Sequence, residues 1–221
     1  MPRPQAPALF PELKRKRVPG LDLENRFREQ GYARVAGVDE AGRGPLAGPV
    51  VAAAVVLPES IGAGSPLRKV RDSKMLDAGR REALYEAVAA GAVDCAWAMC
   101  DAREIDEMNI LAASLEAMRR AVAALEPAPD LILVDGNQPV PCRIPSVTVV
   151  KGDRLCLSIA AASILAKVIR DRIMRELHKQ FPAYGFDLHK GYATAEHKKA
   201  ILRNGPCPVH RRTFRGVKEC V

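Results

Sequence analysis

The chain has 221 residues, of which 48% are hydrophobic, so it is long enough to bury the core of a single domain. Lysine and arginine outnumber aspartate and glutamate by 34 to 26, and the resulting net charge of +8 favours an anionic partner, nucleic acid first. The sequence contains no apolar run of about 18 residues that would span a membrane, and its start lacks the apolar core of a signal peptide, so we expect a cytoplasmic protein that does not enter membranes.

The predicted elements begin after a short arm. Residues 1–20 combine prolines with a basic run before any periodic apolar pattern, and we interpret them as a flexible arm ahead of one domain, residues 21–221. Apolar runs predict the first three strands at 34–39, 49–57 and 93–99. The second run is apolar almost throughout, as expected of a strand that is buried on both faces. Three strands in succession favour an antiparallel meander.

The second half of the chain mixes helical and strand patterns. After Asp101, apolar side chains recur every three or four residues and predict one helix, which is closed by prolines from Pro127 onwards. A Gly-Asn-Gln-Pro turn joins two further predicted strands, and two amphipathic helices follow them. The strands are predicted at 131–135 and 146–150, and the helices at 158–180 and 194–203. This order predicts one α/β domain, a mixed sheet flanked by helices, with a helical C-terminal extension.

Two adjacent acids, Asp39 and Glu40, stand where the first predicted strand meets a glycine-rich turn. Neighbouring side chains of a regular strand point to opposite faces, so these two acids share one site only if the strand ends or bends between them. The turn glycines supply the conformational freedom for such a bend. An isolated Asp-Glu pair is far more often a solvated strand end, so the rest of the sequence must decide.

The same arrangement recurs twice. The strand at 131–135 ends on Asp135 before a glycine, and Lys-Gly-Asp153 follows the strand at 146–150. Because functional groups gather at strand ends along one edge of an α/β sheet, we expect four carboxylates to converge. Their mutual repulsion calls for a cation, and oxygen ligands suit Mg²⁺ or Mn²⁺ in a two-metal phosphodiester hydrolysis. A structural role, in which each acid caps a strand or helix, fits the same pattern equally well.

The stretch GVDEAGRGPLAGPV at residues 37–50 resembles the signature of the ribonuclease HII family, and further family motifs follow in order. They are DSKML (72–76), IDEMNI (105–110), VDGN (134–137), KGD (151–153), SIAAASILAKV (158–168), YGF (184–186), HKGY (189–192) and HRR (210–212). The resemblance covers most of the chain and implies a ribonuclease H-like fold. It also implies an endoribonuclease that degrades the RNA of RNA/DNA hybrids and nicks duplex DNA 5′ of an embedded ribonucleotide, leaving 5′-phosphate and 3′-hydroxyl ends.

The resemblance assigns the metal-binding and catalytic carboxylates to Asp39, Glu40, Asp135 and Asp153, the same four that the strand-end argument selects. They would hold two Mg²⁺ or Mn²⁺ ions.

The resemblance also assigns the recognition of the ribonucleotide. Backbone groups of Gly42, Arg43 and Gly44 would contact the 2′-hydroxyl beside the cut, and Tyr192 would stack on the following sugar. Glycine allows a backbone to approach a sugar closely, and the 2′-hydroxyl distinguishes RNA from DNA. A tyrosine in a glycine-flanked loop more commonly serves packing alone.

Further candidate phosphate contacts come from two motifs. Lys74 lies in the Asp-Ser-Lys motif, and Ser163, Lys167 and Arg170 form a polar strip along the long predicted helix. The alternative for Lys167 is an i,i+4 ion pair with Asp171, and for Arg170 we favour a solvated helix face. The basic segment 210–215 either extends the binding track or is free, flexible charge.

Rival interpretations come from other classes of protein. A non-catalytic nucleic-acid-binding protein would use the same basic surface and would still bind in the presence of a chelator. A nucleotide phosphotransferase needs a G-x-x-x-x-G-K-[ST] phosphate cradle, which the sequence lacks. A nuclease of broad specificity would also cut pure RNA or pure DNA duplexes.

Two features bear on family and assembly. The segment before Asp39 is too short for the extra N-terminal domain of ribonuclease HIII, which favours the HII family. Residues 215–221 lack the paired aromatics of a clamp-binding peptide, so we expect a monomer whose partners are RNA/DNA hybrid and ribonucleotide-containing duplex DNA.

Overall fold

A computed structural model describes residues 18–70 and 77–221. Most of the predicted N-terminal arm lies outside the described residues. The Asp-Ser-Lys motif, including the candidate phosphate contact Lys74, also lies outside them.

Five strands form one mixed sheet in the order β3-β2-β1-β4-β5. The strands are β1 (Val35–Ala41), β2 (Val50–Val56), β3 (Asp94–Cys100), β4 (Leu131–Asp135) and β5 (Ser146–Val149). β2 pairs antiparallel with β1 and β3, whereas β4 pairs parallel with β1 and β5. Each predicted strand overlaps an observed one closely, so the predicted mixed sheet of an α/β domain is confirmed.

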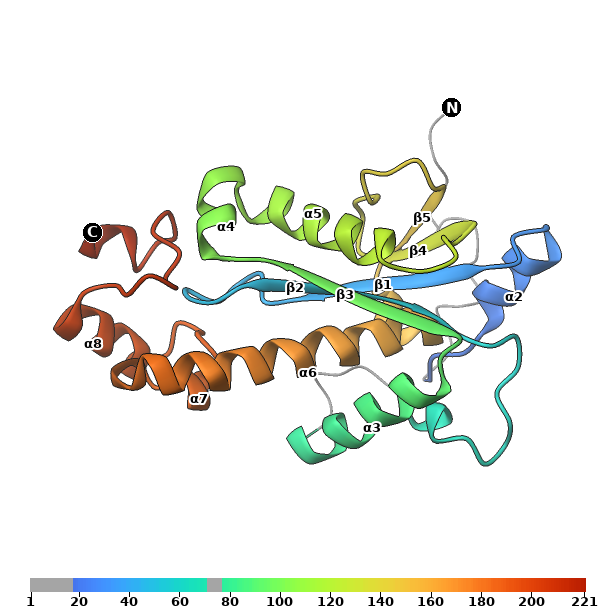
Figure 1. Cartoon of the computed structure of the whole chain (residues 1–221), viewed down its shortest axis with the longest axis horizontal. Helices are drawn as coiled ribbons and strands as arrows, with labels where there is room; N and C mark the ends of the chain where they lie inside the picture. The colour runs from blue at the N-terminus through green and yellow to red at the C-terminus, as the bar shows by residue number, and fades with distance from the viewer. Residues whose placement is uncertain (1–17, 71–76) are drawn as a thin grey trace.

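Helices cover both faces of this sheet (Figure 1). α5 (Ile110–Ala123) packs on one face, and α6 (Leu157–Gln180) packs on the other beside α3 (Ala78–Gly91). Because side chains alternate along a strand, Ala52 of β2 belongs to the core under α5 and its neighbour Ala53 to the core under α6. β2 is buried along its whole length, which confirms the prediction from its apolar run.

Among the described residues before β3, two helices were not predicted. α2 (Asp22–Glu29) precedes β1, and α3 lies between β2 and β3, so the antiparallel strands do not form an uninterrupted meander. α3 buries only Leu84 and Val88 along its 14 residues, so it carries too little apolar periodicity to be recognised in the sequence. A short 3-10 turn, η2 (Pro66–Lys69), precedes it.

The single helix predicted after Asp101 is in fact two helices. α4 (Ala102–Met108) and α5 are separated by Asn109, whose φ angle is 70°. The Asn109 side chain accepts hydrogen bonds from the backbone N–H groups of Leu111 and Ala112 and thereby caps α5. Asparagine is a favoured helix cap, so the side-chain bonds hold this turn and the chain continues without losing its apolar spacing.

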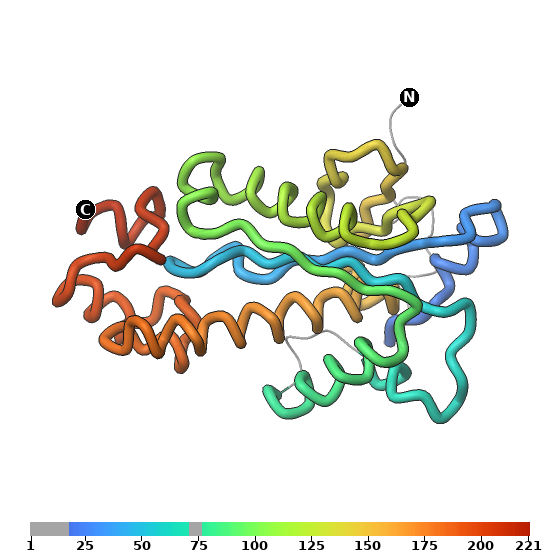
Figure 2. The backbone as a smooth tube through the Cα atoms, in the orientation of Figure 1, coloured from blue at the N-terminus to red at the C-terminus, as the bar shows by residue number. Residues whose placement is uncertain are grey.

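The C-terminal extension is helical, as predicted. It comprises the 3-10 turns η5 (Pro182–Tyr184) and η6 (Lys218–Cys220) and the helices α7 (Phe186–His189) and α8 (Ala195–Asn204). These elements enclose a small core of their own around Phe186. Figure 2 shows the extension at one end of the molecule, beside the loop that joins β1 to β2. A backbone hydrogen bond of 2.8 Å from Leu46 to Gly191 ties the two together.

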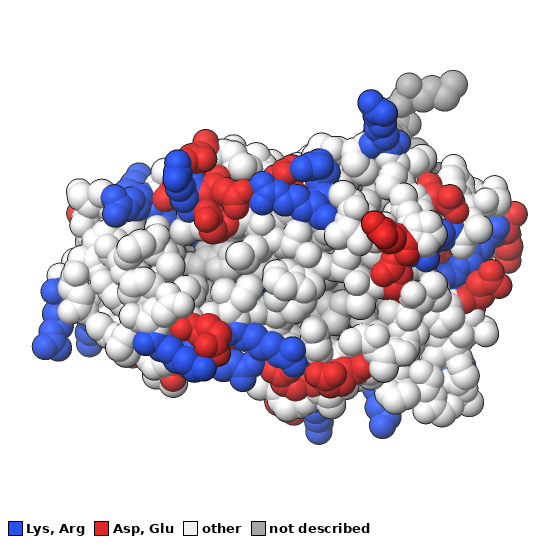
Figure 3. Space-filling model, in the orientation of Figure 1, with Lys and Arg blue, Asp and Glu red and all other residues white. Residues whose placement is uncertain are grey.

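The surface seen in Figure 3 has its charges along two margins, with an almost uncharged band between them. The edge strand β3 crosses this band and exposes Trp97 and Met99. The predicted basic surface is therefore not found on this face. Among the described helices, none is both long and apolar enough to cross a membrane.

Candidate active site

Asp39 and Glu40 both lie within β1, which continues to Ala41 and does not end between them. Asp39 pairs with Ala53 and Glu40 with Ala52, so the two side chains emerge on opposite faces of the sheet. The strand therefore does not end between the two acids, which was one of the two conditions under which we expected them to share a site. The parallel pairing of β1 with β4 stops at Val38. The last residue of β4 is a further acid, which lies beyond that point and next to both Asp39 and Glu40.

That acid is Asp135, and its charge acts on both residues of the pair. Burial, the largest cause, and the charges of Glu40 and Asp135 raise the pKa of Asp39 well above its usual value. Burial and Asp135 also raise the pKa of Glu40, while Arg43 opposes the shift from 3.5 Å away. The structure therefore brings three of the four predicted acids into electrostatic contact.

The fourth acid stands directly beside the third. Asp135 accepts a hydrogen bond of 2.6 Å from the backbone N–H of Gly152, which begins the 3-10 turn η4 (Gly152–Arg154) and precedes the buried Asp153. A Cβ atom at Gly152 would lie 2.6 Å from the Ile159 side chain, so only glycine allows this turn to pack between β4 and α6.

The donor chemistry of this cluster fits a hard divalent cation. All four predicted ligands are carboxylates, and the raised pKa values of Asp39 and Glu40 show that their charges are poorly compensated by the protein. In residues 18–70 and 77–221, no three His, Cys, Asp or Glu side chains are already gathered closely enough to hold an ion. The acids are thus neighbours whose side chains are not gathered around a common point.

Ser163 lies beneath the acids. Its side chain is buried and makes a hydrogen bond to Asp39, which lowers the pKa of Asp39 against the effect of burial. On the opposite face of the sheet, a pocket beside α5 is lined by Glu40, Arg43, Asp135 and Gln138, among others. The acids therefore have a buried support on the α6 side and an opening on the α5 side.

The glycine-rich turn that follows β1 is held by a buried arginine of the C-terminal segment. Arg211 is fully buried and donates from its guanidinium nitrogens to the carbonyl oxygens of Gly42, Arg43 and Gly48, at 2.5, 2.9 and 3.1 Å. Free, flexible charge, one of the two alternatives for segment 210–215, is therefore wrong at Arg211.

A second buried arginine holds the base of the same turn. Arg170 donates to the carbonyl oxygens of Ala47, Pro49 and Lys190 at 3.0 to 3.2 Å. The solvated helix face that we favoured for Arg170 is wrong, because the side chain is fully buried. Sequence analysis missed both roles because it expects arginine at the surface; the only signal was that Arg170 and Arg211 lie in or beside motifs of the family.

Tyr192 presents an open aromatic face beside Arg170, the arginine that holds the base of the turn. Its side chain is 44% exposed, and Lys167 Nζ and Arg170 Cζ lie 5.9 and 5.8 Å from the ring centre. Lys167 also pairs with Asp171 at 2.7 Å, as its alternative predicted. An exposed ring with cations at its border suits stacking against a sugar or base of an anionic strand.

Two buried histidines fix the Tyr192 segment from below. Nδ1 of His197 lies 2.9 Å from the Tyr192 carbonyl oxygen, and its Nε2 lies 3.0 Å from Nε2 of His210. Nδ1 of His210 accepts a hydrogen bond from the backbone N–H of Cys207. With that nitrogen acting as an acceptor, the chain of bonds is complete when both imidazoles are neutral. Sequence analysis gave His197 no role, and His210 entered it only as part of the HRR motif and the basic segment 210–215.

A family model described as Ribonuclease HII matches residues 36–217. The ribonuclease HII of Geotalea daltonii is 54% identical over 201 residues, which cover 91% of each chain. That of Chlamydia trachomatis serovar A is 51% identical over 200 residues, or 90% of each chain.

Solved structures resemble the fold as well. The ribonuclease H2 from Pyrococcus horikoshii OT3 is 31% identical with a TM-score of 0.70, over 85% of this chain and 96% of that one. The Archaeoglobus fulgidus ribonuclease HII, solved in complex with PCNA, is 28% identical with a TM-score of 0.67, over 82% and 95%. Bst-RNase HIII in complex with Mn²⁺ is 21% identical with a TM-score of 0.66, over 85% and 68%, and is a likeness of fold alone.

Proposed function

Because the chain belongs to the ribonuclease HII family of metal-dependent endoribonucleases, we propose that it cuts the RNA strand of RNA/DNA hybrids and nicks duplex DNA 5′ of an embedded ribonucleotide. The observation that carries this proposal is the proximity of mutually repelling carboxylates on β1 and β4, beside a turn whose residues Arg43 and Gly44 are exposed.

In this proposal Asp39, Glu40, Asp135 and Asp153 hold two Mg²⁺ or Mn²⁺ ions. Such ions would stabilise the charge that develops on the scissile phosphate and would lower the pKa of an attacking water, giving 5′-phosphate and 3′-hydroxyl products. The all-oxygen donor set supports hard cations, as does the poor compensation of the carboxylate charges by the protein.

The protein's own residues keep these acids in place. Ser163 holds the Asp39 carboxylate by a hydrogen bond, so we propose that it acts through Asp39 and only secondarily as a phosphate contact. The Gly152 amide orients Asp135, and Arg43 moderates the charge of Glu40. Asp39, Glu40 and Asp135 therefore each have a neighbour that holds or compensates the carboxylate before substrate binds.

Recognition of the ribonucleotide is assigned to the turn and to the exposed tyrosine. Backbone groups of Gly42, Arg43 and Gly44 contact the 2′-hydroxyl, and Tyr192 stacks on the next sugar. A Cβ built on Gly44 meets no atom within 4 Å, which supports an open approach for a sugar. Lys167, and Lys74 outside the described residues, are candidate phosphate contacts.

The domain and its setting are also proposals. Residues 21–221 would form the catalytic domain behind an arm at 1–20, although Gly20 already makes backbone hydrogen bonds with Leu155 and Leu157, so the arm's end is fixed to the domain. We propose a monomer that acts in the cytoplasm, the compartment of its substrates. The association with PCNA belongs to the Archaeoglobus fulgidus protein.

The test is cleavage of a labelled DNA duplex that contains one ribonucleotide, beside an all-DNA duplex of the same sequence and a pure RNA duplex. Each is incubated with Mg²⁺, Mn²⁺ or a chelator. Metal-dependent nicking 5′ of the ribonucleotide, with both controls intact, is the expected result. Binding without nicking under either metal would instead favour a non-catalytic nucleic-acid-binding protein, and cleavage of the controls would favour a nuclease of broad specificity.

A further inference from the structure

We propose that Arg211 is a positioning residue that sets the preference of the site for a ribonucleotide over a deoxyribonucleotide. It would do so by fixing the orientation of two peptide units in the turn after β1. The inference rests on the proposed function, since it concerns the contact between that turn and the 2′-hydroxyl.

The Arg211 side chain lies in an unusual environment for a charged group, because it is fully buried. A buried charge is costly unless hydrogen bonds compensate it, and the hydrogen-bond partners of the Arg211 side chain are carbonyl oxygens. Burial, with the charge of Arg170 next, lowers its pKa to about 9, so the guanidinium is still charged at neutral pH. A residue needed only for packing would carry no such cost. The bonds to Gly42, Arg43 and Gly48 therefore account for the charge at this position.

The bonds to Arg211 also fix the direction in which the neighbouring backbone amide groups point. In a trans peptide the C=O and the following N–H point in opposite directions. The carbonyls of Gly42 and Arg43 point at Arg211, so the N–H groups of Arg43 and Gly44 point away from it. On that side Arg43 and Gly44 are exposed, and a Cβ on Gly44 would meet open space. Arg211 thus orients two amide donors outward, where a hydroxyl oxygen can accept from them.

Arg211 and the turn after β1 are held rigidly together. The Arg211 backbone N–H donates to the Leu46 carbonyl at 2.8 Å, which fixes the arginine to the loop that it holds. Gly42 has a φ angle of 103°, and a Cβ there would lie 2.1 Å from Arg170 Nε. The turn is held between two guanidinium groups. A planar guanidinium binds several carbonyls at once, whereas the ammonium of lysine is a single point of charge.

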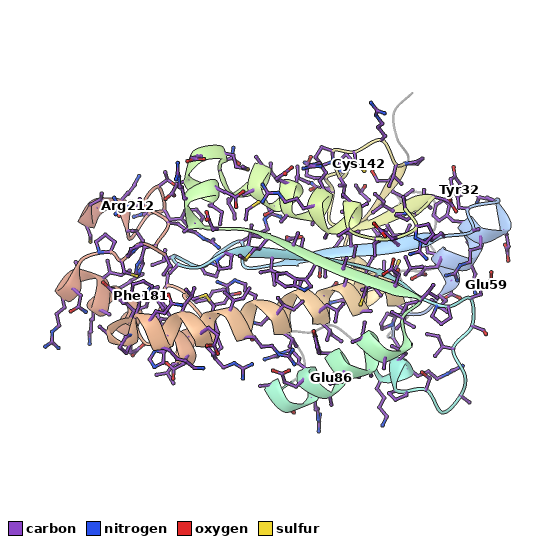
Figure 4. All side chains as sticks on the ribbon, viewed as in Figure 1. Tyr32, Glu59, Glu86, Cys142, Phe181 and Arg212 are labelled. Carbon is purple, nitrogen blue, oxygen red and sulfur yellow. The ribbon has the colours of Figure 1, made fainter. Side chains whose placement is uncertain are left out.

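The experiment compares Arg211→Lys and Arg211→Gln with the wild type and with Arg212→Gln. Arg212 is the exposed neighbour labelled in the C-terminal segment in Figure 4, so its substitution removes the same charge without touching the turn. For each protein we would measure KM for a duplex with one ribonucleotide and the inhibition constant Ki of an all-DNA duplex of the same sequence. Neither constant depends on the fraction of the preparation that is active.

The ratio of Ki to KM reports the preference for the ribonucleotide. We expect both Arg211 variants to lower this ratio by about tenfold, the effect of one or two misaligned hydrogen bonds, while Ki changes by less than about threefold. Arg212→Gln should keep the wild-type ratio, because the loss of a phosphate contact in segment 210–215 would weaken the binding of both duplexes alike. If Arg211→Gln folds poorly, Arg211→Lys decides the matter, because it keeps the charge and the bulk.

An unchanged ratio in Arg211→Lys would overturn the proposal, as would an equal loss of affinity for both duplexes. Failure of the proposed function would look different. In that case the wild type would not cut the ribonucleotide duplex or would show no preference for it.

Discussion

The backbone N–H of Gly152 donates a hydrogen bond of 2.6 Å to Oδ1 of Asp135. This bond joins the end of β4 to the turn that carries Asp153. Because the charge of Asp135 also raises the pKa values of Asp39 and Glu40, one residue connects all four candidate acids.

Mn²⁺ should raise the melting temperature of the protein. A cation offsets the repulsion among the carboxylates, and an ion at a hundredfold excess over its Kd stabilises a fold by about 2.7 kcal/mol, which is roughly 5 °C or more for a chain of this size. A fluorescence melting titration measures the shift. Asp135→Asn should reduce it strongly, whereas Glu107→Gln, an exposed acid on α4 that pairs with Arg103, should not. Equal shifts in both variants would place the ion elsewhere.

The contribution of the buried histidine pair to the stability of the protein should fall as the pH is lowered from about 6.5 towards 4. Burial, followed by the charge of His197, lowers the pKa of His210 from its usual 6.5 to about 4. Over this range the unfolded chain binds a proton that the folded protein excludes, so the free energy of unfolding drops by up to about 1.4 kcal/mol per pH unit. Above about pH 6.5 this contribution is complete. His197, whose pKa burial also lowers, acts in the same direction.

Urea unfolding at a series of pH values measures that slope. His210→Gln should lower the stability at neutral pH and make its dependence on pH shallower than in the wild type. A variant with the wild-type slope would show that the buried pair is not the source of the acid sensitivity.

Tyr192→Ala should weaken cleavage at a single ribonucleotide more than cleavage within a long RNA tract. Stacking on one base or sugar is worth about 1–3 kcal/mol, so kcat/KM on the single-ribonucleotide duplex should fall by about tenfold or more. Tyr192→Phe keeps the ring and should stay close to the wild type. Equal losses on both substrates would contradict the proposed stacking.

The strands, and with them the place of Asp135 at the end of one, could be predicted from the sequence because each signal is local. An apolar run that ends on an acid and a glycine reports both a strand and its end, as at Asp135. The break at Asn109 escaped prediction because the apolar spacing continues through it, and only the φ angle of one residue separates α4 from α5. α3 escaped because it buries little.

The supports of the site could not be predicted because they join residues that are distant in the sequence. The bond from Arg211 to Gly42 links the C-terminal segment to the end of β1, and no sequence pattern reports where a buried guanidinium finds its carbonyl partners. The same holds for Ser163 beneath Asp39. Sequence analysis places an arginine at the surface by default, and here the folded chain overrides that preference.

The central claim, that the clustered acids carry out metal-dependent cleavage, is tested most directly by Asp39→Asn. The rate of cleavage of a labelled RNA/DNA hybrid would be measured in Mg²⁺ and in chelator, together with the affinity for the hybrid. The account predicts no cleavage by the wild type in chelator and a rate at least about 1000-fold lower for Asp39→Asn in Mg²⁺. Affinity should change little, since phosphate contacts come from basic residues and backbone. Full activity in the variant would contradict the assignment of the site.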